Sequence, residues 1–326
     1  MSSIPISSKR ALPRGRARSF YGRLRAGEEL AYAIAATAGA SILVITGLIL
    51  FELYAQSDLS RAKFGWRFLI TSVWDPVAGQ FGALPFIYGT VVTSILALII
   101  AIPLGLGAAI FLAEMAPARI SNALTFLIEL LAAVPSVVYG LLGIFILVPF
   151  LRDSVVPKIK PALGNLPIFN GPFYGVSVFS ASVVLSIMIV PFIISVSREV
   201  LLAVARDQRE ASLALGASQW QTVWRVVLPN ASTGIVGSIF LSLARALGET
   251  MAVTMVIGNT PQIKASLLAP GYTIAAVIAN EFGETSGDLY RSALIQLGLV
   301  LFGVTFVING VARILILTTS GKGAHS

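Results

Sequence analysis

Six long apolar stretches restrict the possible folds of this chain more than any other feature of its sequence. They lie at about residues 30–54, 86–113, 122–150, 176–197, 232–258 and 289–317. Each reaches the roughly 20 apolar residues that a helix needs to cross the hydrocarbon core of a bilayer. Since lipid offers no partner for backbone N–H and C=O groups, each stretch must satisfy them internally, as a helix does. We therefore expect an all-α, polytopic integral membrane protein with about six transmembrane helices, surrounded by a lipid bilayer.

The low content of charged residues supports this interpretation and excludes several classes of function. Charged residues make up 12% of the chain, about half the share that a soluble domain needs to cover its surface. The chain has no cysteine and its single histidine is His325, so we expect neither a metal site nor a catalytic residue inside the fold. The sequence has no G-x-x-x-x-G-K-[ST] motif. We therefore expect no cofactor on this chain, and ATP and Mg²⁺ would have to bind a partner subunit.

The positions of Lys and Arg predict on which side of the membrane the termini lie. Seven of these residues fall in 1–29, before the first apolar stretch. With six spans, 14 Lys and Arg residues lie on the side of both termini and eight on the opposite side. By the positive-inside rule, both termini are cytoplasmic. The predicted organisation is a basic cytoplasmic tail at 1–29, a transmembrane domain at 30–317 and a cytoplasmic end at 318–326, with no nucleic-acid partner needed to explain the net charge of +8.

Prolines and glycines within the apolar stretches predict where the helices bend and pack closely. Three prolines should each kink a helix, because each removes a backbone donor: Pro103, Pro135 and Pro191. Four glycines should let neighbouring helices approach: Gly105, Gly107, Gly140 and Gly143. The segments 55–85 and 152–175 are rich in proline, glycine and aromatic residues and are predicted as external loops with short interfacial helices.

The longest polar insertion on the predicted cytoplasmic side is residues 198–229. Its sequence predicts two short helices around a turn at Gly216. On the second helix, four residues have the i, i+3, i+4, i+7 spacing of a single apolar stripe: Trp220, Val223, Trp224 and Val227. Such a stripe outside the membrane would contact either a groove on a partner protein or a lipid interface.

Residues 210–229 resemble the EAA loop of the permease subunits of ABC importers. The family pattern is E-A-A, three residues, G, nine residues and I-x-L-P, and this chain departs from it only at Ser212 and Val226. The resemblance implies the type I ABC importer permease fold, with 198–229 as a coupling loop that docks into a cytoplasmic ATPase. The residues that it implies as ATPase contacts are Glu210, Ala211, Gly216, Trp220, Trp224, Leu228 and Pro229.

Charged residues within the apolar stretches are candidates for a substrate path, because a charge at the bilayer centre costs about 2.5–3.5 kcal/mol. Arg245 lies at the midpoint of 232–258, and Glu249 follows four residues later, on the same face of a continuous helix. The two side chains could form a self-neutralising structural pair. Alternatively, the guanidinium binds an anion and Glu249 accepts a proton from it. Glu129, about 10 Å deep in its span at 1.5 Å per residue, either lines the path or reaches the interface.

Two segments extend the resemblance to the PstC-type permeases of bacterial phosphate importers: the R-A-L-G-E-T-M-A-V run at 245–253 and the E-L-L-A-A-V-P-S-V-V-Y-G run at 129–140. The resemblance covers about residues 65–317. It implies import of inorganic phosphate across the bacterial inner membrane by alternating access, with Arg245 and Glu249 on the phosphate path. It also implies four partner subunits: a PstA-type permease, two PstB-type ATPases and a PstS-type phosphate-binding protein.

Three alternative functions differ from this expectation in features that the sequence can test. The first alternative is a permease for another oxyanion, such as sulfate, molybdate or phosphonate. Glu249 argues against it, because this carboxylate would repel a fully ionised dianion, whereas phosphate retains a proton that a carboxylate can accept. A secondary transporter or channel would show inverted repeats and would not need an EAA loop. A membrane anchor without transport activity would have no reason to keep Arg245 within a span.

Overall fold

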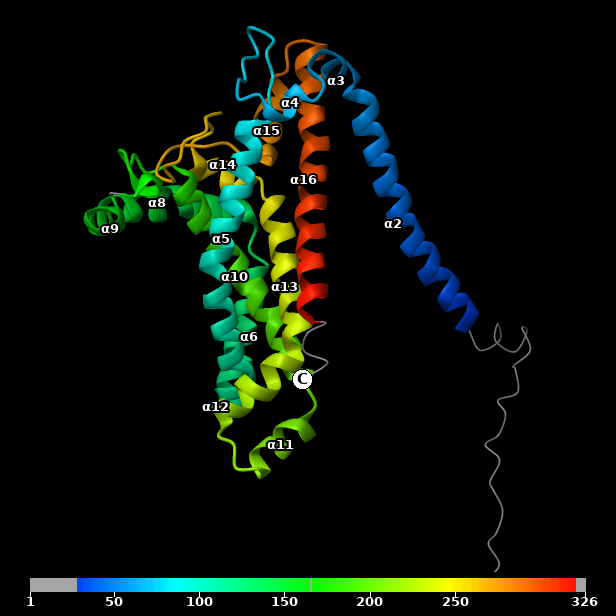
Figure 1. Cartoon of the computed structure of the whole chain (residues 1–326), viewed down its shortest axis with the longest axis vertical. Helices are drawn as coiled ribbons and strands as arrows, with labels where there is room; N and C mark the ends of the chain where they lie inside the picture. Colours follow the sequence, from blue (N-terminus) through cyan, green and yellow to red (C-terminus); the bar gives the residue numbers. More distant parts are fainter. Residues whose placement is uncertain (1–27, 165, 321–326) are drawn as a thin grey trace, which may run out of the picture. The chain divides into compact units, whose positions relative to one another are not determined.

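The computed structural model describes residues 28–164 and 166–320 (Figure 1). The predicted basic tail lies outside these ranges except for residues 28 and 29, and so do residues 321–326. Six helices in the described part of the chain are long and apolar enough to cross a membrane: Leu30–Gln56, Leu84–Met115, Ser136–Ala162, Val178–Leu202, Gln219–Leu247 and Asp288–Val311. The prediction of an all-α protein with about six transmembrane helices is confirmed.

The chain divides into two compact units, residues 1–52 and 53–326. The described part of the first unit is the greater part of helix α2 (Glu28–Gln56), which has no marked polar face. This is the pattern of a helix that is surrounded by lipid or protein along its whole length. The long helices of the second unit are α5 (Leu84–Ile110), α10 (Val178–Leu202), α13 (Leu228–Leu247) and α16 (Asp288–Ser320).

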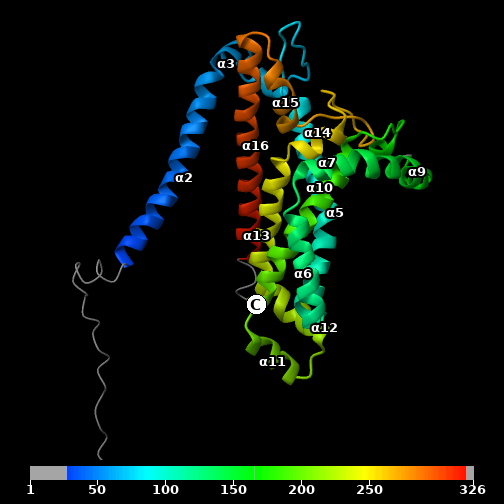
Figure 2. The ribbon, with the colours of Figure 1, turned by 180° about the vertical axis from the view of Figure 1, so that it is seen from behind.

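Helix α10 is the centre of the second unit. It packs against α5, α13, α6 (Ala118–Ala132) and α14 (Met251–Ile257), and both views show it among its neighbours (Figures 1 and 2). Its fully buried side chains include Leu185, Ile189 and Ile193. Because α10 is apolar on every side, it is stable only where other helices or lipid surround it, and here the other helices do so.

Glycines permit close packing at three of the four predicted positions. A Cβ atom added at Gly105 would lie 2.7 Å from Cγ2 of Ile193 on α10. Cβ atoms at Gly140 and Gly143 would lie 2.5 Å and 3.0 Å from side chains of α14. Gly107 differs, because no described atom lies within 4 Å of its added Cβ. Its expected role in helix contact is therefore not met within this chain.

Four π-helical turns share one cause, a proline two residues after each turn ends. The turns are η1 (Phe111–Met115), η2 (Gly143–Leu147), η3 (Leu151–Val155) and η5 (Val223–Val227). The prolines are Pro117, Pro149, Pro157 and Pro229. The residue before each proline donates its N–H to the carbonyl five residues back. A proline has no N–H to offer the carbonyl four residues back, and its ring crowds that oxygen, so the helix widens locally.

Two predicted spans are interrupted rather than continuous. The stretch 122–150 divides at Pro135, where the backbone is extended (ψ 140°) between α6 and α7 (Ser136–Leu142). The predicted kink is a complete break, since α6 ends at Ala132 and the extended Pro135 is the residue from which α7 begins. Beyond η2, helices α8 (Val148–Phe150) and α9 (Val156–Leu163) leave the bundle sideways (Figure 1). The stretch 232–258 divides at residues 248–250, between α13 and α14.

The connecting segments predicted at 55–85 and 152–175 contain short helices. These are α3 (Asp58–Phe64), α4 (Arg67–Ile70), α9 and η4 (Pro167–Phe169), while α15 (Ile274–Glu281) and η6 (Phe282–Glu284) precede α16. A carboxylate joins two of these segments to α16. Glu281 Oε2 accepts hydrogen bonds from Trp74 Nε1 at 2.9 Å and from the Tyr290 hydroxyl at 2.6 Å. This half-buried glutamate therefore supports the fold at one end of the second unit.

Gly89→Ala should destabilise the second unit, because the added methyl group would lie 2.2 Å from the backbone carbonyl oxygen of Tyr272. Overpacking of this kind costs about 1–3 kcal/mol. Gly107→Ala, on the same helix α5, is the matched control, since its Cβ meets no described atom within 4 Å. We expect a lower thermal unfolding temperature in detergent for Gly89→Ala alone. Equal unfolding temperatures of the two variants would contradict the close contact.

Candidate functional site

The two interruptions of the transmembrane helices lie beside each other. Helices α7 and α14, each of which follows an interruption, pack together. The contact is close, since a Cβ atom at Gly140 would lie 3.2 Å from the Ala252 Cα. The structure therefore joins the segments 129–140 and 245–253, which are distant in sequence and which both carried the resemblance to phosphate permeases.

Side chains satisfy backbone groups that each interruption leaves free. The Tyr139 hydroxyl donates a hydrogen bond of 2.7 Å to the Leu131 carbonyl, across the first interruption. Glu249, which is half-buried, accepts the backbone N–H of Ala252 at 3.2 Å. The carboxylate thus caps the first turn of α14. Both bonds replace partners that a continuous helix would have supplied.

Arg245 lies in the last turn of α13, at the edge of the second interruption. The partial negative charge at a helix C-terminus favours a cation there. The guanidinium carbon is 5.8 Å from the centre of the Phe192 ring on α10, and the side chain is exposed. Among the described residues Arg245 forms no hydrogen bond or ion pair. Its N–H donors therefore remain available to an anion, with the planar geometry that suits an oxyanion.

Arg245 and Glu249 do not share a helix face, so that part of the prediction is wrong. The prediction assumed one continuous helix over 232–258, whereas α13 ends at Leu247 and α14 begins at Met251. Once the helix is interrupted, a spacing of four residues no longer sets the relative direction of two side chains. Glu249 caps α14 and forms no ion pair with Arg245 within the described structure. The alternative of a self-neutralising structural pair is therefore not observed.

Glu129 lies one turn before the end of α6, and its side chain is exposed. Because α6 begins at Ala118, Glu129 is about 16 Å along the helix at 1.5 Å per residue. Its place on a substrate path stays a prediction. Its exposed neighbours on α6 are apolar and include Leu127 and Leu130. The described residues show no direct contact between Glu129 and Arg245, nor any group of three His, Cys, Asp or Glu side chains that could hold a metal ion.

The coupling loop predicted at 198–229 begins later and ends earlier than expected. Its first residues belong to α10, which continues to Leu202. Helix α11 (Arg206–Ala214) carries Glu210 and Ala211, both exposed. Gly216 has φ +86°, a conformation that glycine adopts without strain. From Gln219 onward, α12 (Gln219–Thr222), η5 and α13 form one continuous helix that ends at Leu247. Leu228 and Pro229 therefore belong to the transmembrane helix and not to a separate short helix.

The predicted apolar stripe on the second helix divides into two faces. Val223 and Val227 are buried (1% and 0% exposed) and pack against the helical bundle. Trp220 and Trp224 are 53% and 55% exposed and contact each other edge to face, with ring centres 5.7 Å apart. The π-helical turn at Val223–Val227 changes the residue spacing per turn, which explains why an ideal 3.6-residue period did not predict these faces.

A buried ion pair that the sequence analysis did not identify fastens α11 to the bundle. Arg209 Nη2 lies 2.8 Å from Oε1 of Glu114 in η1, and the two side chains are only 17% and 8% exposed. The same Nη2 group donates 2.7 Å to the Leu201 carbonyl at the end of α10. The charges were recognisable in the sequence as opposite and on the same predicted side of the membrane, but no spacing rule joins residues that are so far apart.

Ser212, one of the two departures from the EAA pattern, links the two parts of the predicted coupling segment, which comprises residues 206–229. Its hydroxyl lies 3.0 Å from the Thr222 hydroxyl, within hydrogen-bonding distance. The bond joins α11 to α12 across the turn at Gly216. An alanine at this position could not form it, so the departure adds a polar contact without changing the backbone.

Comparison with known proteins assigns this chain to a transporter family. Residues 101–317 match the family described as binding-protein-dependent transport system inner membrane component. A phosphate transport system permease protein PstC of Mesorhizobium japonicum is 44% identical over 285 residues, which cover 86% of this chain and 87% of that relative. Another PstC, of Xylella fastidiosa, is 47% identical over 262 residues, which cover 79% of this chain and 81% of that relative.

A solved structure supports the fold. A chain of a bacterial ABC transporter involved in the import of the acidic polysaccharide alginate superposes with a TM-score of 0.53 at 17% sequence identity. The match covers 90% of this chain and 98% of that chain. At this low identity, the comparison concerns the arrangement of helices only.

Arg209→Ala should loosen the coupling segment, because it leaves the Glu114 carboxylate buried without its partner. Breaking a buried pair in this way costs about 3–5 kcal/mol. We expect faster amide hydrogen exchange in residues 206–218, by at least tenfold. Arg206→Ala on the same helix is the control, since Arg206 is exposed and should leave the exchange rates unchanged. Unchanged exchange in Arg209→Ala would show that the ion pair does not hold α11.

Proposed function

Because the chain belongs to the family of binding-protein-dependent transport system inner membrane components, we propose that it is the permease subunit of an ATP-driven ABC importer that carries inorganic phosphate into the cytoplasm. The observation that carries the proposal is the state of Arg245, an exposed cation beside two interrupted helices that forms no hydrogen bond or ion pair with the described residues. We infer phosphate as the substrate from the names of the PstC relatives. The chain of the alginate transporter supports the ABC permease fold.

Arg245 binds the phosphate oxygens through its planar fork of N–H donors. Its contact with Phe192 and the end of α13 hold the cation in place without using those donors. Glu249 acts on the same path from the start of α14, where its second carboxylate oxygen can accept a proton from the bound oxyanion while Oε1 caps the helix. Glu129 lines the same path from α6. The interruption between α13 and α14 lets the two segments change their relative direction during alternating access.

The continuous helix from Gln219 to Leu247 connects ATP hydrolysis to this site. At one end it carries the exposed Trp220 and Trp224, and its last turn at the other end carries Arg245. The helix is 29 residues long, or about 43 Å at 1.5 Å per residue. A displacement of the coupling segment by a closing ATPase is therefore transmitted directly to Arg245.

The subunit works within a larger assembly. A PstA-type permease pairs with it, two PstB-type ATPases bind Mg²⁺ and ATP, and a PstS-type protein delivers phosphate from the periplasm. The proposed ATPase contacts lie on α11, at the Gly216 turn and in the first three turns of the helix from Gln219 to Leu247: Glu210, Ala211, Gly216, Trp220, Trp224, Leu228 and Pro229. The chain performs no chemistry and binds no cofactor of its own. It is a multi-pass protein of the inner membrane, with both termini in the cytoplasm.

Arg245→Gln should reduce uptake of radiolabelled phosphate at least tenfold in proteoliposomes that contain the assembled complex, because the amide carries no charge for the anion. Assembly and ATP hydrolysis should persist, and Arg245→Lys should retain part of the uptake. The control is Arg291→Gln, whose guanidinium carbon also lies 5.8 Å from an aromatic ring, that of Phe282. Normal uptake by Arg245→Gln would show that Arg245 does not bind phosphate on its path through the membrane. Uptake of sulfate in place of phosphate by the wild-type complex would refute the proposal that phosphate is the substrate.

Replacing both Trp220 and Trp224 with alanine should weaken the ATPase interaction, because the pair presents the large apolar surface of the coupling segment. We expect at least a tenfold loss of ATPase affinity, measured by co-purification at graded ATPase concentrations. Phe306→Ala is the control, since Phe306 is 73% exposed on α16, away from the coupling segment. If the double variant binds the ATPase as the wild type does, the two tryptophans do not contribute to the ATPase interface.

A further inference from the structure

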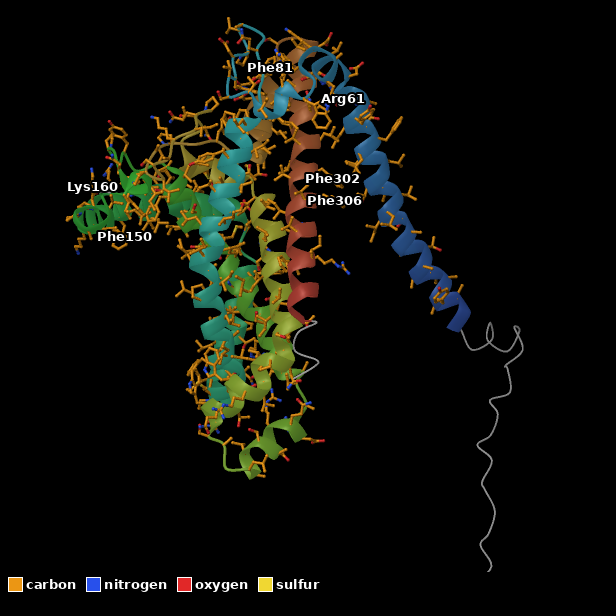
Figure 3. The ribbon with its side chains drawn as sticks, viewed as in Figure 1. Arg61, Phe81, Phe150, Lys160, Phe302 and Phe306 are labelled. Atoms are coloured by element: carbon orange, nitrogen blue, oxygen red, sulfur yellow. The ribbon has the colours of Figure 1, made fainter. Side chains whose placement is uncertain are left out.

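An apolar groove runs along one face of α16 in the second unit. Its volume is about 840 Å³, and the helix contributes residues spaced three or four apart, from Gln296 to Ile308. This length corresponds to about 18 Å at 1.5 Å per residue. The rest of the lining comes from Tyr54 near the end of α2, from α3, α4 and the segment between them, and from α5, through residues such as Arg61, Trp66 and Ile87. Figure 3 shows Arg61 near the first turns of α16, with the labelled Phe302 and Phe306 farther along that helix.

The groove is polar at one end and apolar over the rest of its length. Tyr54, Arg61 and Gln296 lie at the polar end, whereas the lining of α16 beyond Gln296 consists of aliphatic residues and Gly303. Two hydrogen bonds fix α3 at this end. The Ser60 hydroxyl donates to Gln296 Oε1, and the Ser60 N–H donates to the Ser292 hydroxyl at 3.1 Å.

Arg61 is held at the mouth of the groove and retains free donor capacity. Its guanidinium carbon lies 3.6 Å from the centre of the Tyr54 ring. Its Nε donates to the Ser57 hydroxyl at 3.0 Å, and its Nη2 donates to the Tyr54 carbonyl at 2.6 Å. The Nη1 group donates to no described residue. An immobilised guanidinium with an open side is suited to a phosphate group.

The surroundings of Arg61 are basic and aromatic. Within residues 58–67, Lys63 and Arg67 add two further basic side chains, and Asp58 is the one carboxylate. Trp66 is 85% exposed beside them. Tryptophan and long basic side chains at the end of a transmembrane helix lie at the headgroup level of a bilayer, where a cation can pair with a lipid phosphate group. We therefore expect the positive, aromatic mouth of the groove at the membrane surface and its apolar part in the hydrocarbon.

We propose that this groove binds one anionic glycerophospholipid, with its phosphate group at Arg61 and an acyl chain along α16 from Gln296 toward Ile308. Charge complementarity at one end and an apolar lining at the other select this occupant over a polar solute, which would leave the lining exposed to water. Gly303 keeps the channel open. A Cβ at Gly303 meets no described atom within 4 Å, so a larger side chain there fills the groove without disturbing the fold. The proposal does not depend on the transported substrate.

The test uses the assembled complex in vesicles that contain a phosphatidylglycerol with a photoactivatable group in its acyl chain. Labelling of residues 296–308 is then mapped by mass spectrometry and compared with a matched phosphatidylethanolamine probe. We expect at least threefold more labelling by the anionic lipid. Arg61→Gln should remove this preference, and Gly303→Leu should reduce labelling at least fivefold. Gly310→Leu is the matched control, because it lies on the same helix outside the groove lining and its Cβ also meets no described atom within 4 Å.

Three results would overturn the proposal. Equal labelling by the two lipids in the wild type would remove the role of Arg61 in selecting an anionic headgroup. Labelling of Gly303→Leu at the wild-type level would show that the lipid does not enter the groove. Absence of labelling by either lipid in the assembled complex would show that a partner subunit covers this face of α16.

Discussion

The need to satisfy backbone hydrogen bonds in lipid is the constraint on which the rest of this structure depends. Helices meet that need along most of the chain, and local widening meets it before four prolines. At the two complete interruptions, side chains take over: the Tyr139 hydroxyl bonds to the Leu131 carbonyl, and Glu249 caps α14. Because α7 and α14 also pack together, the two interruptions lie beside each other. The irregular backbone of these two spans is therefore concentrated at one site.

This arrangement explains why a charged residue is tolerated beside the interruptions. A cation in the middle of a continuous, lipid-facing helix would be costly, whereas Arg245 lies at a helix end, where the dipole favours it. The ring of Phe192 adds a second favourable contact. Neither contact consumes the N–H donors, so Arg245 combines a stabilised position with unused binding capacity. Glu249 is held differently, by a backbone N–H, which keeps the two charges from neutralising each other.

The coupling segment, like the two interruptions, combines a break in the helices with contacts that hold its parts together. The Arg209–Glu114 pair and the Ser212–Thr222 contact hold α11 against the bundle and against α12. The helix from Gln219 to Leu247 then runs without interruption to the second break. The turn at Gly216 at one end and residues 248–250 at the other are where the helices end, and there we expect movement. A transporter needs stiff elements between such points, because flexible ones would dissipate the displacement.

The sequence by itself determined the features that follow from local rules: the six apolar stretches, the glycine turn at Gly216, and the spacing of the EAA pattern. The expected helix kink at Pro135 was also a local inference, and it underestimated a complete break. Only the tertiary structure decided the relation of Arg245 to Glu249, the packing of α7 on α14, the pairing of Arg209 with Glu114, and the groove along α16. These features depend on contacts between residues far apart in the chain. Periodicity and residue preference describe a helix in isolation and contain no information about which neighbour it will meet.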